Sequence, residues 1–196
     1  MLYSIARVIF TVYFKLFYRI KVTGKENIPK TGPVIICANH PTALDMFLIG
    51  ANVPKRKVHF MAKAELFRNR FLAWIIRHLG AFPVHRGKGD VGSVKTLLKL
   101  LEQGEIVGVF PEGTRSKKKD PNKRKAGIAL FALASGAPVL PVAIKNFRPF
   151  HKVEMIFGKP YRLHSESGEG RKTYSREELQ RLSYDIIESI YALMGQ

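Results

Sequence analysis

Short runs of β-branched and other apolar residues alternate along this chain with stretches whose apolar residues recur at helical spacing. Six of the runs are predicted to be strands: 34–38, 58–62, 81–84, 106–110, 139–144 and 153–157. Helical patterns cover 42–50, 65–79, 91–103, 125–135 and 175–194. Strands that alternate with helices form a mostly parallel sheet with helices on its faces. We therefore predict an α/β fold, a single domain with a mostly parallel sheet flanked by helices.

The chain is long enough and apolar enough to build one full core. It has 196 residues, of which 46% are hydrophobic, and this excludes a disordered chain or a small disulfide scaffold. Cys37 is the only cysteine, so no intramolecular disulfide can form, which fits a reducing compartment. No internal repeat or second domain is visible, and residues 21–196 are expected to form one domain.

Residues 1–20 are rich in apolar side chains but contain Arg7, Lys15 and Arg19. On a helix of about 100° per residue, these and nearby polar residues fall within a sector of roughly 120°. The polar stripe lies opposite three phenylalanines, Phe10, Phe14 and Phe17. This pattern is typical of an amphipathic helix at a membrane surface, although a helix packed on the domain's own core would show the same stripe.

No small-residue cleavage site follows the N-terminal apolar stretch, which argues against a secretory signal. The other long uncharged stretch, 126–144, is interrupted by glycine and proline. It is interpreted as the end of a helix, a turn and a strand, and not as a membrane span.

The chain carries 33 Lys and Arg against 15 Asp and Glu, a formal net charge of +18. This excess favours an anionic partner: nucleic acid, an anionic membrane surface or a phosphorylated substrate. Along the predicted helix 65–79, basic residues recur every seven positions next to an aromatic stripe; the basic residues are Lys63, Arg70 and Arg77, and the stripe is Phe67, Phe71 and Trp74. One hypothesis places this surface on a bilayer beside the N-terminal helix; the alternative places the aromatic rings in the core and the basic face in solvent.

Residues able to do chemistry follow four of the predicted strands. The carboxyl ends of neighbouring parallel strands meet at one edge of a sheet, where ligands bind in open α/β folds. The residues in question are His40 and Asp45 after 34–38, Lys63 after 58–62, Arg86 after 81–84, and Glu112 and Arg115 after 106–110. A lone histidine is more often structural than catalytic, but a base with an acid beside three cations indicates a site for a phosphorylated substrate.

Pro41 suits the first position of a helix and would place His40 at or near its N-cap. From a cap, Asp45 is expected to reach the second ring nitrogen of His40, fix its tautomer and stabilise the imidazolium formed during reaction. In the other turn, Gly113 permits a tight bend that brings backbone N–H groups toward a ligand, and Arg115 offers a planar fork for phosphate. An exposed salt bridge in an ordinary turn is the competing interpretation of that segment.

Several common catalytic motifs are absent from the sequence. It contains no G-x-S-x-G elbow, no G-x-x-x-x-G-K-[ST] loop and no H-E-x-x-H or paired Cys/His ligand set. Covalent serine chemistry, nucleotide hydrolysis and zinc catalysis therefore lose support. A base without an obvious protein nucleophile favours a substrate hydroxyl deprotonated by His40.

Four segments together resemble the motifs of the glycerolipid acyltransferases. NHPTALD at 39–45 is similar to their H-x4-D motif, and FPEGTRS at 110–116 to their phosphate-site motif. GAFPVHRG at 80–87 and VLPVAI at 139–144 resemble the second and fourth motifs, and order and spacing agree over 20–160. Within the family, the similarity is greatest to bacterial 1-acyl-sn-glycerol-3-phosphate acyltransferases.

The resemblance implies that residues 21–196 form a glycerolipid acyltransferase domain. Such an enzyme moves a fatty acyl group from acyl-CoA or acyl carrier protein to the free hydroxyl of lysophosphatidic acid, giving phosphatidic acid, without a metal or a tightly bound cofactor. His40 would be the general base and Asp45 would orient it. The glycerol phosphate would be held by Lys63, Arg86, Glu112, Gly113, Thr114 and Arg115. An anionic membrane surface, and no nucleic acid, would be the further partner, with the protein monotopic or peripheral on the cytoplasmic face of the cell membrane.

The sequence departs from the family pattern at three places. Thr42 stands where Ser is common, which keeps a hydroxyl, and His85 stands where Asp or Asn is frequent. Residues 1–20 leave room for one amphipathic helix, so the two-helix anchor of some relatives is expected to be reduced.

Other functions remain open. The acceptor could be another lysophospholipid or glycerol 3-phosphate. The chain could also be a basic nucleic-acid-binding protein, although it has no RRM, KH or zinc-finger signature, or a catalytically silent membrane adaptor.

Overall fold

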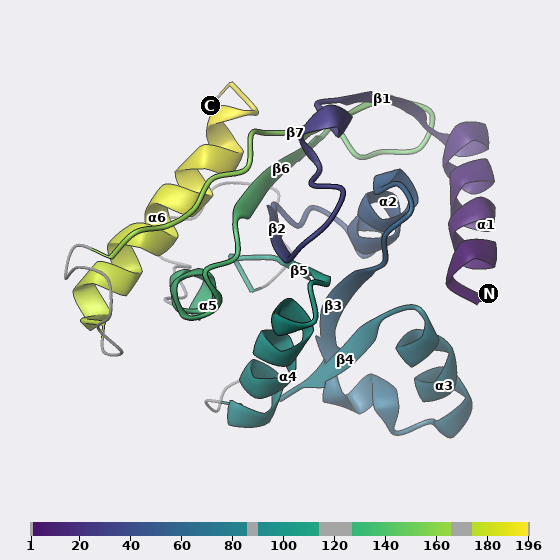
Figure 1. Cartoon of the computed structure of the whole chain (residues 1–196). Coiled ribbons are helices and arrows are strands. Elements are labelled where there is room, and N and C mark those ends of the chain that lie inside the picture. Colours follow the sequence, from purple (N-terminus) through teal and green to yellow (C-terminus); the bar gives the residue numbers. More distant parts are fainter. Residues whose placement is uncertain (1, 86–89, 114–126, 166–173, 196) are drawn as a thin grey trace.

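The sheet of this protein is built almost entirely from parallel strands. The computed structural model describes residues 2–85, 90–113, 127–165 and 174–195. Within them, seven strands pair in the order β1-β7-β6-β2-β5-β3-β4, and β6 and β7 are antiparallel (Figure 1). The strands are β1 (Arg19–Thr23), β2 (Val34–Ala38), β3 (Val58–Lys63), β4 (Ala81–Val84), β5 (Ile106–Val109), β6 (Val139–Lys145) and β7 (Lys152–Phe157). The predicted α/β class is confirmed.

Strand β1 is the one strand of this sheet that the sequence pattern does not predict. It lies at the sheet edge and pairs in parallel with β7, from Arg19 opposite Lys152 to Thr23 opposite Ile156. Its five residues alternate between exposed and half-buried positions. An edge strand with a polar outer face lacks the continuous apolar run that marks the central strands.

The helices are α1 (Leu2–Phe17), α2 (Asp45–Asn52), α3 (Arg70–His78), α4 (Val91–Glu102), α5 (Gly127–Ser135) and α6 (Arg176–Ala192), with short 3-10 turns η1 (Lys25–Asn27) and η2 (Ala64–Phe67). Two differ from the prediction. The helix expected over 42–50 begins at Asp45. The helix expected over 65–79 is split into η2 and α3, because the side chain of Asn69 accepts a hydrogen bond from Leu72 N at 3.0 Å and starts a new helix there.

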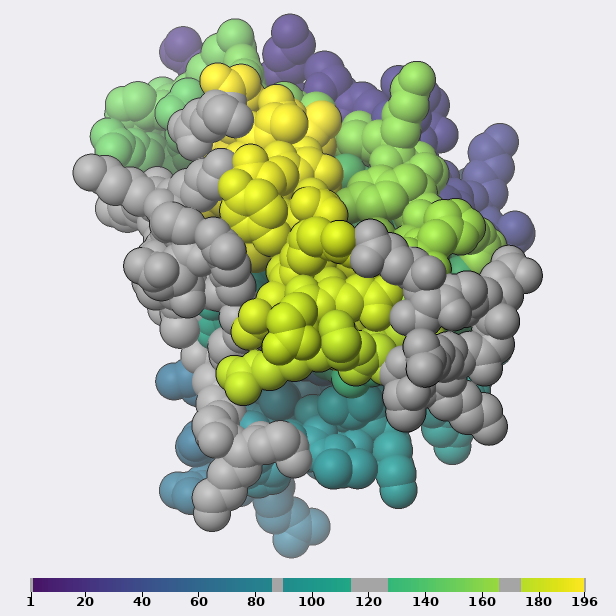
Figure 2. All heavy atoms as spheres, turned by 90° about the vertical axis from the view of Figure 1, so that its left-hand side faces the viewer, coloured from purple at the N-terminus to yellow at the C-terminus, as the bar shows by residue number. Residues whose placement is uncertain are grey.

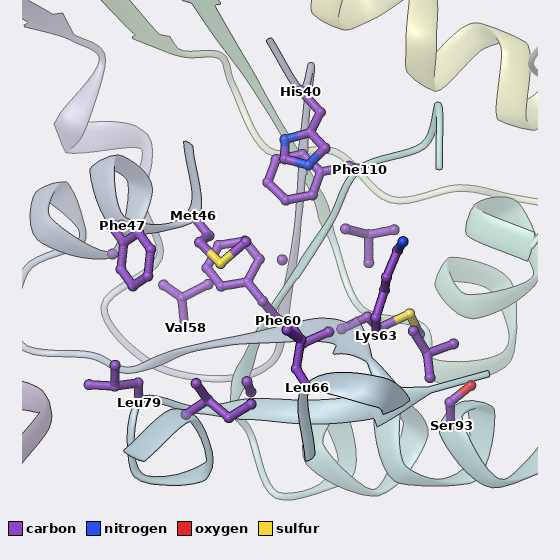
Figure 3. Close-up of a pocket in the computed structure, with 18 of the residues that line it drawn as sticks. His40, Met46, Phe47, Val58, Phe60, Lys63, Leu66, Leu79, Ser93 and Phe110 are labelled. Atoms are coloured by element: carbon purple, nitrogen blue, oxygen red, sulfur yellow. The ribbon is translucent and has the colours of Figure 1, made fainter. Parts of the chain in front are cut away.

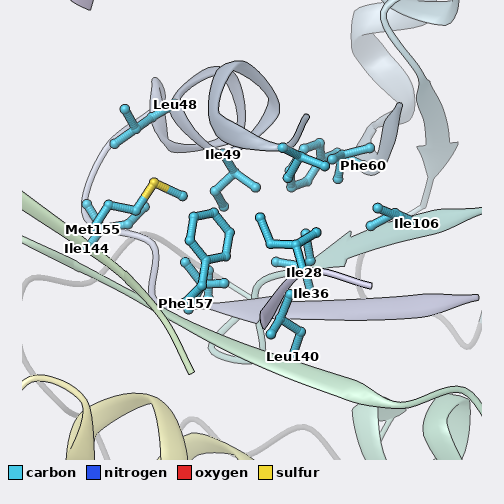
Figure 4. Packing of buried hydrophobic residues seen from close by; sticks show 14 of the residues in the cluster. Ile28, Ile36, Leu48, Ile49, Phe60, Ile106, Leu140, Ile144, Met155 and Phe157 are labelled. Atoms are coloured by element: carbon cyan, nitrogen blue, oxygen red, sulfur yellow. The ribbon is translucent and has the colours of Figure 1, made fainter. Parts of the chain in front are cut away.

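Two hydrophobic cores lie on opposite faces of the sheet. Strand β2 is buried along its whole length, and it sends Ile36 to the face covered by α1 and α2 and Ile35 to the face covered by α4, α5 and α6. Figure 4 shows the first core, in which Ile36 and Phe157 lie beneath Ile49 of α2. Figure 2 shows α6 running across the surface of the other face.

Helix α1 contributes to the first core with one side and exposes another. Phe14 is buried, and Phe10 stacks on Phe47 of α2 with ring centroids 4.2 Å apart. The opposite side carries large exposed apolar residues, namely Ile5, Val8, Ile9, Val12 and Leu16. The helix is therefore apolar toward both the domain and the solvent. No helix among the described residues is long and apolar enough to cross a membrane.

Candidate active site

The side chain of Asn39 fixes the chain at the end of β2, just before His40. Its amide nitrogen donates to Ile144 O at 2.9 Å, and its amide oxygen accepts from Ile144 N at 2.8 Å. The β2–β6 pairing ends at Ala38, so Asn39 continues it through its side chain. The buried amide thereby sets the direction in which His40 leaves the sheet.

His40 and Asp45 form a buried hydrogen-bonded pair. His40 Nδ1 lies 2.8 Å from Asp45 Oδ2, and Asp45 is fully buried. A carboxylate only accepts hydrogen bonds, so Nδ1 carries the hydrogen, and in the neutral imidazole the lone pair is on Nε2. The predicted contact between the two side chains is therefore present, although its setting differs from the prediction. His40 is not a helix N-cap, since Leu44 occupies that position and residues 41–44 form a turn.

Thr42 holds the carboxylate of Asp45 from the other side. The Thr42 backbone N–H donates to Oδ2 at 2.9 Å, and the Thr42 hydroxyl donates to Oδ1 at 2.8 Å. The same hydroxyl accepts from Leu44 N at 3.1 Å. Asp45 thus receives three hydrogen bonds, which is what a buried carboxylate requires. The side-chain group of residue 42 that makes these bonds is the hydroxyl, which Ser and Thr share.

A column of stacked rings holds the imidazole of His40 in place. Phe110 stacks on His40 with centroids 4.0 Å apart and planes 14° apart, and Phe60 stacks on Phe110 at 5.7 Å and 13°. Gly108 makes room for this column, because a Cβ at that position would lie 2.1 Å from Cε1 of Phe60. The orientation of His40 thus depends on β3 and β5 as well as on Asp45.

A pocket of about 960 Å³ begins at His40 and is lined mainly by apolar side chains (Figure 3). It runs along β3, since both Lys63 at the carboxyl end of the strand and Val58 at its start line it. The length of β3 from Val58 to Lys63 is roughly 16 Å. Tyr3 of α1 also lines the pocket, and its hydroxyl accepts from Val58 N at 3.1 Å. Figure 3 shows Lys63 extending into the pocket, while Phe47 and Leu79 lie at its other side.

The structure brings some of the predicted substrate-binding residues to this pocket. Lys63 and Gly113 line it together with His40. Gly113 has a φ of +66°, and its N–H donates to Phe110 O at 2.9 Å, so the tight turn itself uses this group. Arg86, Thr114 and Arg115 lie outside the described residues.

The side chain of Glu112 is buried and does not line the pocket, although its neighbours Pro111 and Gly113 do. Its Oε1 accepts a hydrogen bond from the Tyr191 hydroxyl of α6 at 2.7 Å. Burial raises the pKa of Tyr191 above its ordinary value, and the hydrogen bond and charge of Glu112 raise it further, so the phenol remains a donor.

Sequence reasoning missed the supporting roles of Asn39, Phe110 and Tyr191. Asn39 directly precedes His40, and Phe110 is the first residue of FPEGTRS. Their places in these two motifs were the available signal. Tyr191 lies 79 residues after its partner and shows no local signal at all. Within the described ranges, no cluster of three or more His, Cys, Asp or Glu side chains is arranged to hold a metal ion.

Comparison with known proteins identifies the family of this chain. The family model described as Acyltransferase matches residues 19–145, more than half of the chain. This chain belongs to the acyltransferase family. The matched range contains His40, Asp45, Lys63, Glu112 and Gly113. The prediction of an O-acyltransferase of the glycerolipid family is thereby confirmed.

Curated relatives of this acyltransferase carry one enzyme name. The 1-acyl-sn-glycerol-3-phosphate acyltransferase of Bacillus subtilis (strain 168) is 36% identical over 147 residues, which cover 72% of this chain and 73% of the relative. The enzyme of the same name from Borreliella burgdorferi is 34% identical over 143 residues, or 71% of this chain and 56% of the relative. This acyltransferase chain thus spans nearly three quarters of the first relative and just over half of the second.

A solved structure shares the whole fold. The crystal structure of the 1-acyl-sn-glycerophosphate (LPA) acyltransferase PlsC from Thermotoga maritima aligns with a TM-score of 0.69 at 28% identity. The alignment covers 100% of this acyltransferase and 79% of that chain. The likeness therefore includes α1 at one end and α6 at the other, both of which extend beyond the family match.

Proposed function

We propose that this acyltransferase transfers a fatty acyl group from acyl-CoA or acyl carrier protein to the free hydroxyl of 1-acyl-glycerol 3-phosphate, giving phosphatidic acid. The names of its relatives support this acceptor. One observation carries the proposal: the buried His40–Asp45 pair lies at the edge of a large apolar pocket. A base beside a cavity for hydrocarbon suits an acyl acceptor or an acyl donor, because both carry a fatty acyl chain.

In the proposed reaction, His40 Nε2 takes the proton of the acceptor hydroxyl. The hydroxyl oxygen attacks the carbonyl carbon of the thioester, a C–O bond forms, and the C–S bond breaks. The thiolate leaves with the proton that His40 returns to it, so the base is restored. Asp45, held through Nδ1 at 2.8 Å, fixes the tautomer and compensates the positive charge on the imidazole between the two proton transfers. Base assistance of this kind contributes about 10² to 10⁴ in rate.

The glycerol phosphate is proposed to bind at the carboxyl ends of the strands. Lys63 and the Gly113 turn line the pocket there, and Arg86, Thr114 and Arg115 are proposed to complete the phosphate site. The acyl chain would lie along β3 toward Tyr3, where the pocket is apolar. Glu112, whose side chain faces Tyr191, would then act by holding the turn rather than by contacting glycerol.

We propose an anionic membrane surface as the working location, with residues 1–20 as the membrane helix and 21–196 as the catalytic domain. The exposed apolar side of α1 supports this assignment, with Val8 and Ile9 each 60% exposed. Because Phe10 and Phe14 pack on the domain, the membrane-facing side is formed by these aliphatic residues and not by the phenylalanines. The protein would be monotopic or peripheral on the cytoplasmic face of the cell membrane.

The proposal is tested with purified protein, vesicles containing one lysolipid each, and labelled acyl-CoA or acyl carrier protein. We expect diacyl product with lysophosphatidic acid, and a loss of about 10² to 10⁴ in kcat for His40→Ala. Asp45→Asn should lose activity while keeping its size in the core. His151→Ala, at an exposed histidine away from the pocket, is the matched control.

Each alternative has its own outcome in this assay. Equal product from wild type and His40→Ala would show that the mechanism is wrong. Product with glycerol 3-phosphate or another lysophospholipid, but not with lysophosphatidic acid, would replace the acceptor. No product with any acceptor, together with salt-sensitive binding of DNA or RNA, would favour a nucleic-acid-binding protein.

A further inference from the structure

Helix α3 exposes aromatic side chains that a globular domain usually covers. Phe71 is 72% exposed and Trp74 is 53% exposed, whereas Ala73 on the inner side of the helix is buried. The interpretation that places the aromatic stripe in the core is therefore wrong for Phe71 and Trp74, whereas Phe67 is half-buried. Two large rings three positions apart point outward on one surface of a short helix, and such exposed apolar groups mark contact surfaces.

Basic residues flank the exposed rings of α3. At about 100° per residue, Arg70 and Arg77 fall within roughly 20° of each other, on the side of the helix next to Trp74. Both are exposed, and α3 contains no acidic residue. A helix with outward aromatic rings and a basic flank combines apolar and electrostatic attraction toward an anionic lipid surface.

The position of α3 relative to the pocket is the second observation. The pocket is lined on one side by α1, through residues such as Tyr3 and Phe10, and on another by η2 and α3, through Leu66 and Ile76. In Figure 1, α1 and α3 lie along the same side of the molecule. Two helices with exposed apolar faces thus border one cavity. If both borders contact the bilayer, a lipid chain can move between the bilayer and this cavity without crossing water.

We propose that α3 is a second membrane-contacting element, which inserts Phe71 and Trp74 into the interface of an anionic bilayer while Arg70 and Arg77 contact lipid phosphates. Tryptophan and other aromatic residues gather at the level of lipid headgroups, where their rings are partly desolvated. Together with α1, this contact would seat both borders of the pocket on one bilayer. The inference rests on the proposed function, because a lipid substrate is what gives the second contact its use.

The chain offers a direct reporter for this contact, since Trp74 is its only tryptophan. Wild-type protein is mixed with vesicles of phosphatidylcholine and phosphatidylglycerol. We expect its emission to shift to shorter wavelength, to be protected from an aqueous quencher and to be quenched by brominated acyl chains. If the protein sediments with the vesicles while emission and aqueous quenching stay unchanged, α3 remains in water and the proposal is overturned.

A charge variant tests the basic flank. Arg70→Gln/Arg77→Gln should reduce partitioning onto these vesicles on the order of 30-fold, roughly fivefold for each basic residue near an anionic surface. The matched control is Lys95→Gln/Lys99→Gln, two exposed lysines on α4, which packs on the opposite face of the sheet. An equal loss in both double variants would indicate general charge attraction and overturn the assignment to α3.

Two further measurements separate this proposal from the proposed function. Activity on detergent-dispersed lysophosphatidic acid should be the same in wild type and Arg70→Gln/Arg77→Gln, because the catalytic pair is untouched. Absence of activity in both proteins would instead count against the proposed function. A shift of Trp74 emission with an acidic carrier protein, but not with vesicles, would assign α3 to a protein partner and overturn the membrane contact.

Discussion

Replacing Gly108 by alanine should disturb the active site through one clash. A Cβ at this position would lie 2.1 Å from Cε1 and 2.6 Å from Cδ1 of the Phe60 ring. Carbon atoms in contact are about 3.5 Å apart or more, so the ring must move by more than about 1 Å. Phe60 is only 6% exposed, so its ring can yield only toward the pocket that it lines. Overpacking of this kind costs about 1–3 kcal/mol.

The displacement of Phe60 should reach His40, the proposed general base. Phe60 stacks on Phe110, which stacks on His40 at 4.0 Å. A misplacement of about 1 Å at a catalytic group can cost on the order of 10² in rate. For Gly108→Ala we therefore expect a Tm lower by roughly 2–12 °C, at 2–4 °C per kcal/mol. We also expect a fall in kcat that exceeds any change in KM.

The measurements are thermal unfolding and steady-state acyl transfer on Gly108→Ala, Phe60→Leu and the double variant. Leucine lacks the ring edge that the new methyl group meets, so the double variant should be more stable than the sum of the two single changes predicts. Gly127→Ala is the stability control, because its Cβ would lie 3.5 Å from Phe131, an ordinary contact. A Gly108→Ala protein with wild-type Tm and kcat, or strict additivity in the double variant, would refute the reasoning.

Two further predictions concern groups around the site. Tyr191→Phe leaves Oε1 of buried Glu112 without its 2.7 Å donor, so unfolding free energy should fall by about 1–3 kcal/mol. Chemical denaturation checks this against Tyr161→Phe, whose hydroxyl contact is longer at 3.3 Å and only partly buried; an equal or larger loss in Tyr161→Phe would contradict the prediction. Asp90 accepts hydrogen bonds from the backbone N–H groups of His85 and Ser93, and these hold its carboxyl pKa below the ordinary value. The ionised form is therefore the stabilising one, and its contribution is complete above about pH 4 and lost as the pH falls through the lowered pKa. The Tm difference between wild type and Asp90→Ala should accordingly be constant near neutrality and shrink in acid, and a difference that grows in acid would show the sign to be wrong.

The strands that matter for the site were predictable because burial on both faces leaves a continuous apolar run. Val34–Ala38 and the start of β5 at Ile106 are buried and match the sequence prediction. Ala81–Val84 also matches, although β4 is a mostly half-buried edge strand, because all four of its residues are apolar. The edge strand β1 was not predictable, since half of its side chains face solvent and its pairing partner β7 lies more than a hundred residues away. The local pattern of apolar residues indicates whether a strand is buried. It does not indicate which distant segment pairs with that strand.

The contact between His40 and Asp45 followed from the position of both residues after a central strand. Its geometry did not, because Pro41 suggests a helix start that the structure places at Asp45. The Thr42 bonds to the Asp45 carboxylate compete with helix formation in this turn. Thr42 donates to the Asp45 carboxylate and does not cap a helix. The spacing of the sequence alone does not distinguish such a residue from the first residue of a helix.

The two motif turns are supported by different parts of the fold. Asn39 ties the His40 turn to β6, whereas Tyr191 of α6 ties the Glu112 turn to the second core. Helix α6 lies beyond the family match that ends at residue 145, yet Ile186 and Tyr191 are buried on this face. Glu112 can remain buried only where a donor meets it, so a residue outside the family match helps to keep a motif residue in position. The acyltransferase site therefore depends on packing that the motifs themselves do not contain.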